Sequence, residues 1–208
     1  MAAAKFITLE GGEGGGKTTQ AKRLVEALAS AGIRAVATRE PGGAPGAEEV
    51  RSLLVSGAPA RWDPLTEALL HFAARREHLQ RTIHPALAAG TWVVCDRFTD
   101  STMAYQGYAQ GLGRDTVERL ESLVQGGRRP DLTLILDLPV EAGLAREQQR
   151  GGSDRYARMG AEFHGRVRDA FRNIARREPQ RCALIDATLP VDDVAAAIWT
   201  KVRERLFA

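Results

Sequence analysis

The chain of 208 residues has little of several features that mark specialised classes of protein. Its two cysteines, Cys95 and Cys182, each lie in an apolar run without a C-x-x-C pattern, so we expect buried reduced thiols rather than a disulfide or a zinc site. No stretch approaches the roughly 18 consecutive apolar residues of a membrane-spanning helix, and no signal-peptide pattern opens the sequence. We therefore expect a cytoplasmic protein with no membrane partner.

A large excess of charge of one sign is missing as well. The formal net charge is +3, and the arginines are spread along the chain without a basic tail. This distribution is typical of a solvated surface on which a few arginines are available to hold phosphates, so we expect no nucleic-acid partner. A hydrophobic content of 44% with 26% charged residues is typical of one globular domain, which we expect to span residues 1–208.

Short apolar runs alternate with longer amphipathic segments. The runs predict five strands, at 6–9, 35–38, 92–95, 132–138 and 183–185. The segments predict helices at about 17–31, 47–56, 64–89, 114–125, 140–149, 160–177 and 191–206. Because apolar strands separated by helices favour a parallel sheet buried on both faces, we expect a three-layer α/β fold with a five-stranded parallel sheet flanked by helices. Pro85 either kinks the 64–89 helix or begins a separate last turn.

The stretch LEGGEGGGKTT, residues 9–19, places five glycines beside one lysine. Its spacing Gly11-x-x-x-x-Gly16-Lys17-Thr18 is the pattern of a phosphate-binding loop, and it lies between a predicted strand and a predicted helix. Backbone N–H groups and the helix N-terminus can face phosphates there, Lys17 can reach the outer phosphates, and the Thr18 hydroxyl can ligate Mg²⁺. A glycine-rich turn capped by threonine would explain the glycines but not the lysine–threonine pair. We predict a nucleoside triphosphate site made of Gly11, Gly12, Glu13, Gly14, Gly15, Gly16, Lys17, Thr18 and Thr19.

Charged residues follow the second and third predicted strands. Arg39 and Glu40 come after one strand, and Asp96 and Arg97 come after the next. Since ligands of open α/β sheets collect outside the carboxyl ends of the strands, these side chains can converge beside the phosphate-binding loop, although mutual salt bridges are the alternative. The guanine-reading pattern N-K-x-D and the switch pattern D-x-x-G are both absent, which disfavours a regulatory GTPase.

Two groups of side chains could recognise a base. Phe72 and Arg75 are three residues apart on one helix face and suit stacking and edge hydrogen bonds, but Phe72 also fits the apolar stripe of this helix, and spacing alone favours the core. Thr102, Tyr105 and Gln106 form a polar and aromatic trio that could read a base edge, or could belong to a surface helix.

The segment REQQRGGSDRYAR, residues 146–158, sets four arginines around two glycines. Such a segment can act as a mobile lid that brings cations to the charge on a transferring phosphoryl group. A solvated helix and loop with paired arginines is the alternative.

These motifs together resemble those of bacterial thymidylate kinases, which transfer the γ-phosphoryl group of ATP to dTMP and give dTDP. The resemblance rests on FITLEGGEGGGKTTQ, TREPGG, FAARREHL, VVCDRFTDSTMAYQGYA, RPDLTLILDL and RGGSDR, which run in order from about residue 6 to residue 177. It implies a P-loop NTPase fold with a nucleoside monophosphate kinase domain, ATP and dTMP as substrates, and Mg²⁺ as cofactor. It also implies a homodimer, for which the helices at 64–89 and 114–125 could supply the contact.

The resemblance further implies an acceptor site made of Arg39, Glu40, Arg51, Phe72, Arg75, Asp96, Arg97, Thr102, Tyr105 and Gln106. In it Arg39 and Arg97 would hold the dTMP phosphate, oriented by Glu40 and Asp96, and Thr18 and Asp96 would serve the metal. Phe72 would stack on thymine and Arg75 would donate to its O4. Thr102 and Gln106 would reach the polar edge of the base, while Tyr105 would crowd the 2′ position.

No arginine lies inside the phosphate-binding loop, whose interior is Gly12-Glu13-Gly14-Gly15. The resemblance therefore implies that the catalytic cation comes from 146–158, with Arg150 the first candidate and Arg155 the second, beside Lys17 and Arg97. Three consecutive glycines stand at 14–16, where relatives often have alanine in the middle; a missing methyl group should leave the loop intact.

Two other functions remain open from the residues. A deoxynucleoside kinase would phosphorylate an uncharged hydroxyl and would need a carboxylate base, for which Glu40 could serve. A non-catalytic ATP-binding module would bind ATP and use no nucleoside monophosphate as acceptor.

Overall fold

The computed structural model describes residues 3–149, 151 and 155–207. Within this part of the chain the strands form one sheet in the order β2-β3-β1-β4-β5, and every neighbouring pair is parallel. The strands are β1 Phe6–Glu10, β2 Ala35–Arg39, β3 Trp92–Asp96, β4 Leu132–Asp137 and β5 Cys182–Asp186. The predicted five-stranded parallel sheet is confirmed, with each strand end within about one residue of its expected place.

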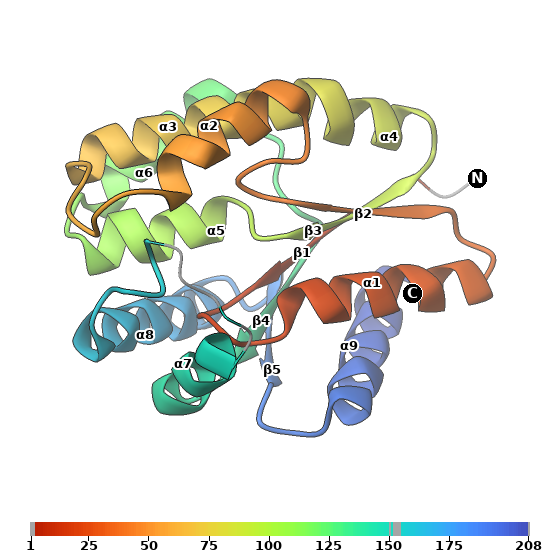
Figure 1. Ribbon diagram of the computed structural model, residues 1–208. Helices are drawn as coiled ribbons and strands as arrows, with labels where there is room; N and C mark the ends of the chain where they lie inside the picture. The colour runs from red at the N-terminus through yellow and green to blue at the C-terminus, as the bar shows by residue number, and fades with distance from the viewer. Residues whose placement is uncertain (1–2, 150, 152–154, 208) are drawn as a thin grey trace.

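Helices connect the strands and cover both faces of the sheet (Figure 1). Along the chain they are α1 Lys17–Ser30, α2 Pro45–Val55, α3 Pro64–His78, α4 His84–Ala88, α5 Thr99–Thr102, α6 Arg114–Gln125, α7 Val140–Gln149, α8 Ala161–Arg177 and α9 Val191–Leu206. Successive strand residues turn to opposite faces: Leu134 and Leu136 pack with α1 and α9, whereas Ile135 packs with α6 and α8. Both faces of the sheet are therefore buried, and the three-layer prediction is confirmed.

The segment predicted as one helix over 64–89 is divided in the structure. A π-helical turn, η1 Leu79–Ile83, separates α3 from α4. The backbone stays right-handed helical across the junction, at His78, Leu79, Ile83 and His84, so Pro85 follows a π-helical turn within a continuing helix rather than a break in the helix.

The helical segment after β3 was not predicted. It consists of α5 and the π-helical turn η2 Met103–Ala109, and it carries the trio Thr102, Tyr105 and Gln106. The N–H of Gln110 bonds to the carbonyl of Tyr105, five residues back. Such wide turns present side chains at angles that a regular helix does not, and they recur at functional sites.

Cys95 and Cys182 are both buried and free, as expected. No helix among the described residues is both long and apolar enough to span a bilayer.

Candidate functional site

The glycine-rich loop leaves β1 and enters α1, as the sequence predicted. Gly11, Gly14 and Gly16 have φ angles of 127°, 68° and 84°, which only glycine adopts readily. In the described chain no side chain caps the N-terminus of α1, and its first turn contains no acidic residue. The free N–H groups and the positive end of the helix dipole therefore remain available to an anion.

Lys17 and Thr18 stand at the start of α1. The Lys17 ammonium donates to the carbonyl oxygen of Gly12 at 2.6 Å, and the Thr18 hydroxyl donates to the Asp96 carboxylate at 2.5 Å. Burial, together with the nearby Arg97, lowers the pKa of Lys17 to about 8. The loop thus places the Lys17 ammonium beside the uncapped N-terminus of α1, near the carboxyl end of β3.

One cavity of about 250 Å³ joins the loop to the acceptor side. The predicted residues that line it are Glu13, Gly14, Gly15, Gly16, Lys17, Thr18, Arg39, Glu40, Arg51, Arg75, Asp96, Arg97, Thr102, Tyr105 and Gln106. Sequence reasoning missed other lining residues: Pro41, Val55, His71, Phe98, Ser101, Glu147 and Tyr156. Most of these are apolar or aromatic, and nothing in their local pattern separates them from core positions.

Arg97 lies between the loop and the acceptor side of the cavity. Its φ of 68° is left-handed, which is unusual for a residue with a side chain. The guanidinium donates to Glu13 at 2.8 Å, to the Gly11 carbonyl at 2.9 Å and to Ser101 at 3.2 Å. The Tyr105 hydroxyl also donates to Glu13, at 2.8 Å. Burial acts to raise the pKa of Glu13, but Arg97 and Lys17 outweigh it and bring that pKa to about 2.

Arg75 reaches the other end of the cavity from α3. Although only 2% exposed, it lines the cavity, with Nε donating to Glu40 at 2.7 Å and Nη2 donating to Thr102 at 3.1 Å. Glu40 also meets Nδ1 of His78 at 3.0 Å. The third nitrogen of Arg75, Nη1, is buried and has no hydrogen-bond partner among the described residues. A buried donor of this kind is costly unless a ligand takes it up.

Phe72 lies behind Arg75 rather than on the cavity wall. The ring is 1% exposed and belongs to a core cluster, and the Arg75 guanidinium carbon lies 4.8 Å from its centroid. The core interpretation that spacing favoured therefore describes Phe72 in this structure. The ring supports the guanidinium by a cation–π contact.

Five predicted residues lie toward the rim of the cavity or outside it. Arg39 is an exposed side chain paired with Glu48 at 3.1 Å, and Arg51 donates to the Pro41 carbonyl at 2.8 Å. Gly11 and Gly12 belong to the loop but line a smaller neighbouring cavity near α7, and Thr19 is exposed on α1.

The structure corrects the prediction for Arg155. This side chain is fully buried and lies away from the cavity wall, where its three nitrogens donate to Glu67 and to the carbonyl oxygens of Leu54 and Pro59. Because all three of its nitrogens already donate to buried protein oxygens, the geometry favours a structural role for Arg155. Arg150, the first candidate for the catalytic cation, lies outside the described residues.

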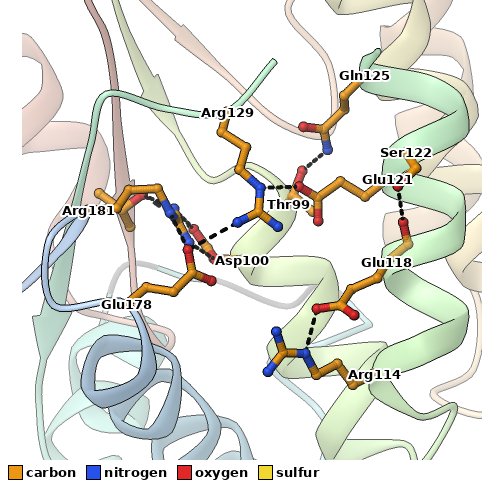
Figure 2. Close-up of polar contacts among 11 residues, drawn as sticks. Thr99, Asp100, Arg114, Glu118, Glu121, Ser122, Gln125, Arg129, Glu178 and Arg181 are labelled. Atoms are coloured by element: carbon orange, nitrogen blue, oxygen red, sulfur yellow. Dashed lines mark hydrogen bonds and ion pairs between the residues drawn. The ribbon is translucent and has the colours of Figure 1, made fainter. Parts of the chain in front are cut away.

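A network of ion pairs contacts α5, the short helix that follows Arg97 (Figure 2). Arg181 donates to both carboxylate oxygens of Asp100, at 2.7 and 2.9 Å, and its Nε lies 2.8 Å from Glu178. Arg129 joins Glu178 to Glu121 at 3.2 and 3.1 Å. The bidentate contact fixes α5 against the end of α8 and the start of β5.

Comparison with known proteins agrees with this geometry. Residues 9–198 match the family model described as Thymidylate kinase. A protein of Caulobacter vibrioides named Thymidylate kinase is 54% identical over 201 residues, which is 97% of each chain. Proteins of the same name from a Bradyrhizobium species and from Magnetococcus marinus are 50% and 48% identical, over 98% of this chain and 91% and 97% of theirs. The chain therefore belongs to the thymidylate kinase family.

Proposed function

We propose that this chain transfers the γ-phosphoryl group of ATP to dTMP and releases dTDP and ADP. The observation that carries the proposal is that one cavity has both the lysine of the phosphate-binding loop and the buried Arg75 in its walls, and that Nη1 of Arg75 has no hydrogen-bond partner in the described chain. An enzyme that joins two nucleotides needs such a shared space, because the acceptor oxygen must approach the γ-phosphorus in line.

In the proposed reaction the protein mainly aligns and stabilises. Lys17 and the loop N–H groups hold the triphosphate, while Arg97 and Arg39 position the acceptor phosphate. This phosphate is already an anion, so no general base is required. Glu40 supports this view, because its carboxylate already accepts from Arg75 and faces His78. That engagement disfavours the deoxynucleoside kinase, which would need Glu40 as a base.

Thr18 and Asp96 would hold Mg²⁺. The Thr18 hydroxyl and an Asp96 carboxylate oxygen are neighbours at the cavity wall, near Lys17, and such hard oxygen donors suit Mg²⁺. No group of three or more acidic, histidine or cysteine side chains that could hold a metal occurs among the described residues, so ATP itself would supply the other ligands. When bound, the ion offsets negative charge on the phosphates.

The remaining roles follow from position in the cavity. The unpaired Nη1 of Arg75 would donate to O4 of thymine, Thr102 and Gln106 would face the polar edge, and Tyr105 would crowd the 2′ position of the sugar. Arg51 would approach the acceptor phosphate. Arg150 stays the sequence-based candidate for the catalytic cation, in a lid at about 146–158 of the single domain.

We also propose a homodimer in the cytoplasm. Leu65 and Leu69 lie four residues apart on α3 and are 43% and 48% exposed, and Leu123 of α6 is 80% exposed. These side chains support a contact between copies through the two helices named from the sequence. Analytical ultracentrifugation of the chain and of Leu69→Glu tests it, with a shift to monomer expected in the variant.

A substrate panel tests the proposed reaction. The purified chain is incubated with ATP and Mg²⁺ and with dTMP, dUMP, dCMP, dGMP or thymidine, and the diphosphate product is measured. Product from dTMP supports the proposal. Faster turnover of thymidine than of dTMP would indicate a deoxynucleoside kinase, and ATP binding without any accepted monophosphate would indicate a non-catalytic module.

A further inference from the structure

Glu67 of α3 is a fully buried carboxylate surrounded by donors. Its Oε1 accepts hydrogen bonds from Gln106 at 2.6 Å, from Gln110 at 3.0 Å and from the Tyr156 hydroxyl at 3.1 Å. Its Oε2 accepts from the Arg155 guanidinium. An arginine keeps its positive charge, so a buried guanidinium at this distance requires the negative carboxylate. Glu67 can therefore only accept, on both of its oxygens.

This constraint decides which way the Gln106 amide points. The atom that faces Glu67 has to be the NH₂ group, because a carboxylate cannot donate to an amide oxygen. Gln106 is 1% exposed yet lines the cavity, and its Oε1 accepts no hydrogen bond from the described residues. The amide oxygen is therefore the acceptor that Gln106 has left to offer a ligand.

Arg75 supplies the opposite kind of group to the same cavity. Its Nη1 is a buried donor to which the described part of the chain supplies no partner, and its Nη2 contacts Thr102, which lies four residues before Gln106. The cavity thus offers a fixed donor and a fixed acceptor. A thymine or uracil ring presents O4 as an acceptor beside N3–H as a donor, which matches this pair. Cytosine presents an N4 amino donor beside an N3 acceptor. It would therefore place a donor against the Arg75 donor and an acceptor against the Gln106 acceptor.

We propose that Glu67 is a positioning residue for pyrimidine specificity, which it sets by holding the Gln106 amide with its oxygen toward the acceptor cavity. The inference rests on the proposed function, because it takes a pyrimidine monophosphate as the acceptor. Sites that hydrogen-bond a substrate discriminate strongly, since the wrong partner leaves buried polar groups unpaired. Glu67 itself does not line the cavity.

The substitution Glu67→Gln tests the proposal. Arg155 still requires an oxygen, so the new amide turns its oxygen to the guanidinium and its NH₂ to Gln106. Gln106 must then rotate and present its own NH₂ to the cavity. We expect the ratio of kcat/KM for dTMP to that for dCMP to fall at least tenfold, while the KM for ATP stays within about twofold. An unchanged ratio in a folded variant would overturn the proposal.

Gln110→Leu is the matched control. It removes another donor from the same Glu67 oxygen, but Gln110 does not line the cavity. We expect the dTMP to dCMP ratio to stay within about twofold of the unsubstituted chain. A fall as large as that of Glu67→Gln would mean that any disturbance near Glu67 moves the ratio, and would overturn the specific role. If the unsubstituted chain fails to phosphorylate dTMP, the proposed function fails instead, which separates the two outcomes.

A measurement on the unsubstituted chain covers the case in which Glu67→Gln does not fold. The side-chain NH₂ resonances of Gln106 are assigned in nitrogen–proton correlation spectra by their loss in Gln106→Leu. We expect these protons to exchange with water more slowly than those of the exposed Gln180, because they face the buried carboxylate. Exchange as fast as that of Gln180 would overturn the proposed orientation.

Discussion

Gly14 and Gly143 meet backbone to backbone. A methyl group built on Gly14 would lie 2.1 Å from the carbonyl oxygen of Gly143, and one built on Gly143 would lie 2.5 Å from that of Glu13. The phosphate-binding loop therefore rests directly on α7, the helix that leads into the segment 150–154. The two glycines are required by contact across the fold as well as by the backbone angle at Gly14.

A matched pair of alanine substitutions tests this contact. Gly14→Ala combines the clash with a φ of 68°, and we expect it to lower the free energy of unfolding by about 2 kcal/mol or more and to weaken ATP binding. Gly15→Ala meets only ordinary contacts, at 3.5 Å from the Gly12 carbonyl and 3.7 Å from Leu136, and we expect a change within about 0.5 kcal/mol. Urea unfolding and ATP titration measure both; equal effects at the two positions would contradict the argument.

Lys17→Ala is expected to abolish turnover while the fold remains. In the described chain the Lys17 ammonium donates to the carbonyl oxygen of Gly12, which belongs to the same loop. No buried carboxylate among the described residues has Lys17 as its main partner, so the fold should tolerate its removal. We expect kcat to fall by about 10³-fold or more, because the charge on the outer phosphates loses its nearest cation. Lys22→Ala, an exposed position on the same helix, is the control and should keep the normal rate. Normal turnover by Lys17→Ala would contradict the proposed role of the phosphate-binding loop in the reaction.

The lowered pKa of Lys17 predicts how ATP binding depends on pH. With a pKa of about 8 in the folded chain, the ammonium is charged below pH 8 and loses its proton above it. Phosphates favour the charged form, so we expect the Kd for ATP to be constant below pH 7 and to rise toward about tenfold per pH unit above 8. Calorimetry at pH 9 in buffers of different ionisation enthalpy should detect proton uptake on binding. Binding without proton uptake would contradict the assignment.

Arg97 and Arg39 should differ in their importance for the acceptor. Arg97 is held by Glu13 and Gly11 inside the cavity, whereas the Arg39 side chain is 54% exposed and pairs with Glu48. We expect Arg97→Asn, which tolerates the left-handed backbone, to lower kcat/KM for dTMP by about 10²–10³-fold. We expect less than about tenfold for Arg39→Asn. Steady-state kinetics decide the order, and a larger loss at Arg39 would reverse the assignment.

Arg155→Met tests the corrected role of this arginine. It leaves the buried Glu67 carboxylate without its cation, so we expect the free energy of unfolding to fall by about 3–5 kcal/mol. Arg23→Met is the control: it breaks the exposed pair with Asp192, and we expect about 0–1 kcal/mol. Urea denaturation measures both. Full stability together with a large loss of kcat would restore the catalytic interpretation of Arg155.

The features of this protein that could be predicted from its sequence are those that depend on residue types at fixed spacing and on strand direction. The loop from Gly11 to Lys17 needs particular residue types at fixed offsets, and Arg97 follows a strand whose parallel direction sends its carboxyl end to the same edge as the loop. The five strands, most of the helices between them, the loop, and the residues that line the cavity from strand ends could therefore be predicted from the sequence.

Contacts between distant segments could not be predicted in this way. Phe72 and Arg155 carry residue types that suit a nucleotide site, yet the ring lies in the core and the guanidinium pairs with Glu67, 88 residues away in sequence. Likewise, the orientation of Gln106 depends on a carboxylate on another helix. The sequence alone determined the phosphate-binding loop and the sheet edge that faces it, because those features follow from spacing and strand direction. Only the tertiary structure decided which arginines face the cavity and which way the Gln106 amide points, because burial and partner choice arise when segments far apart in the chain come into contact.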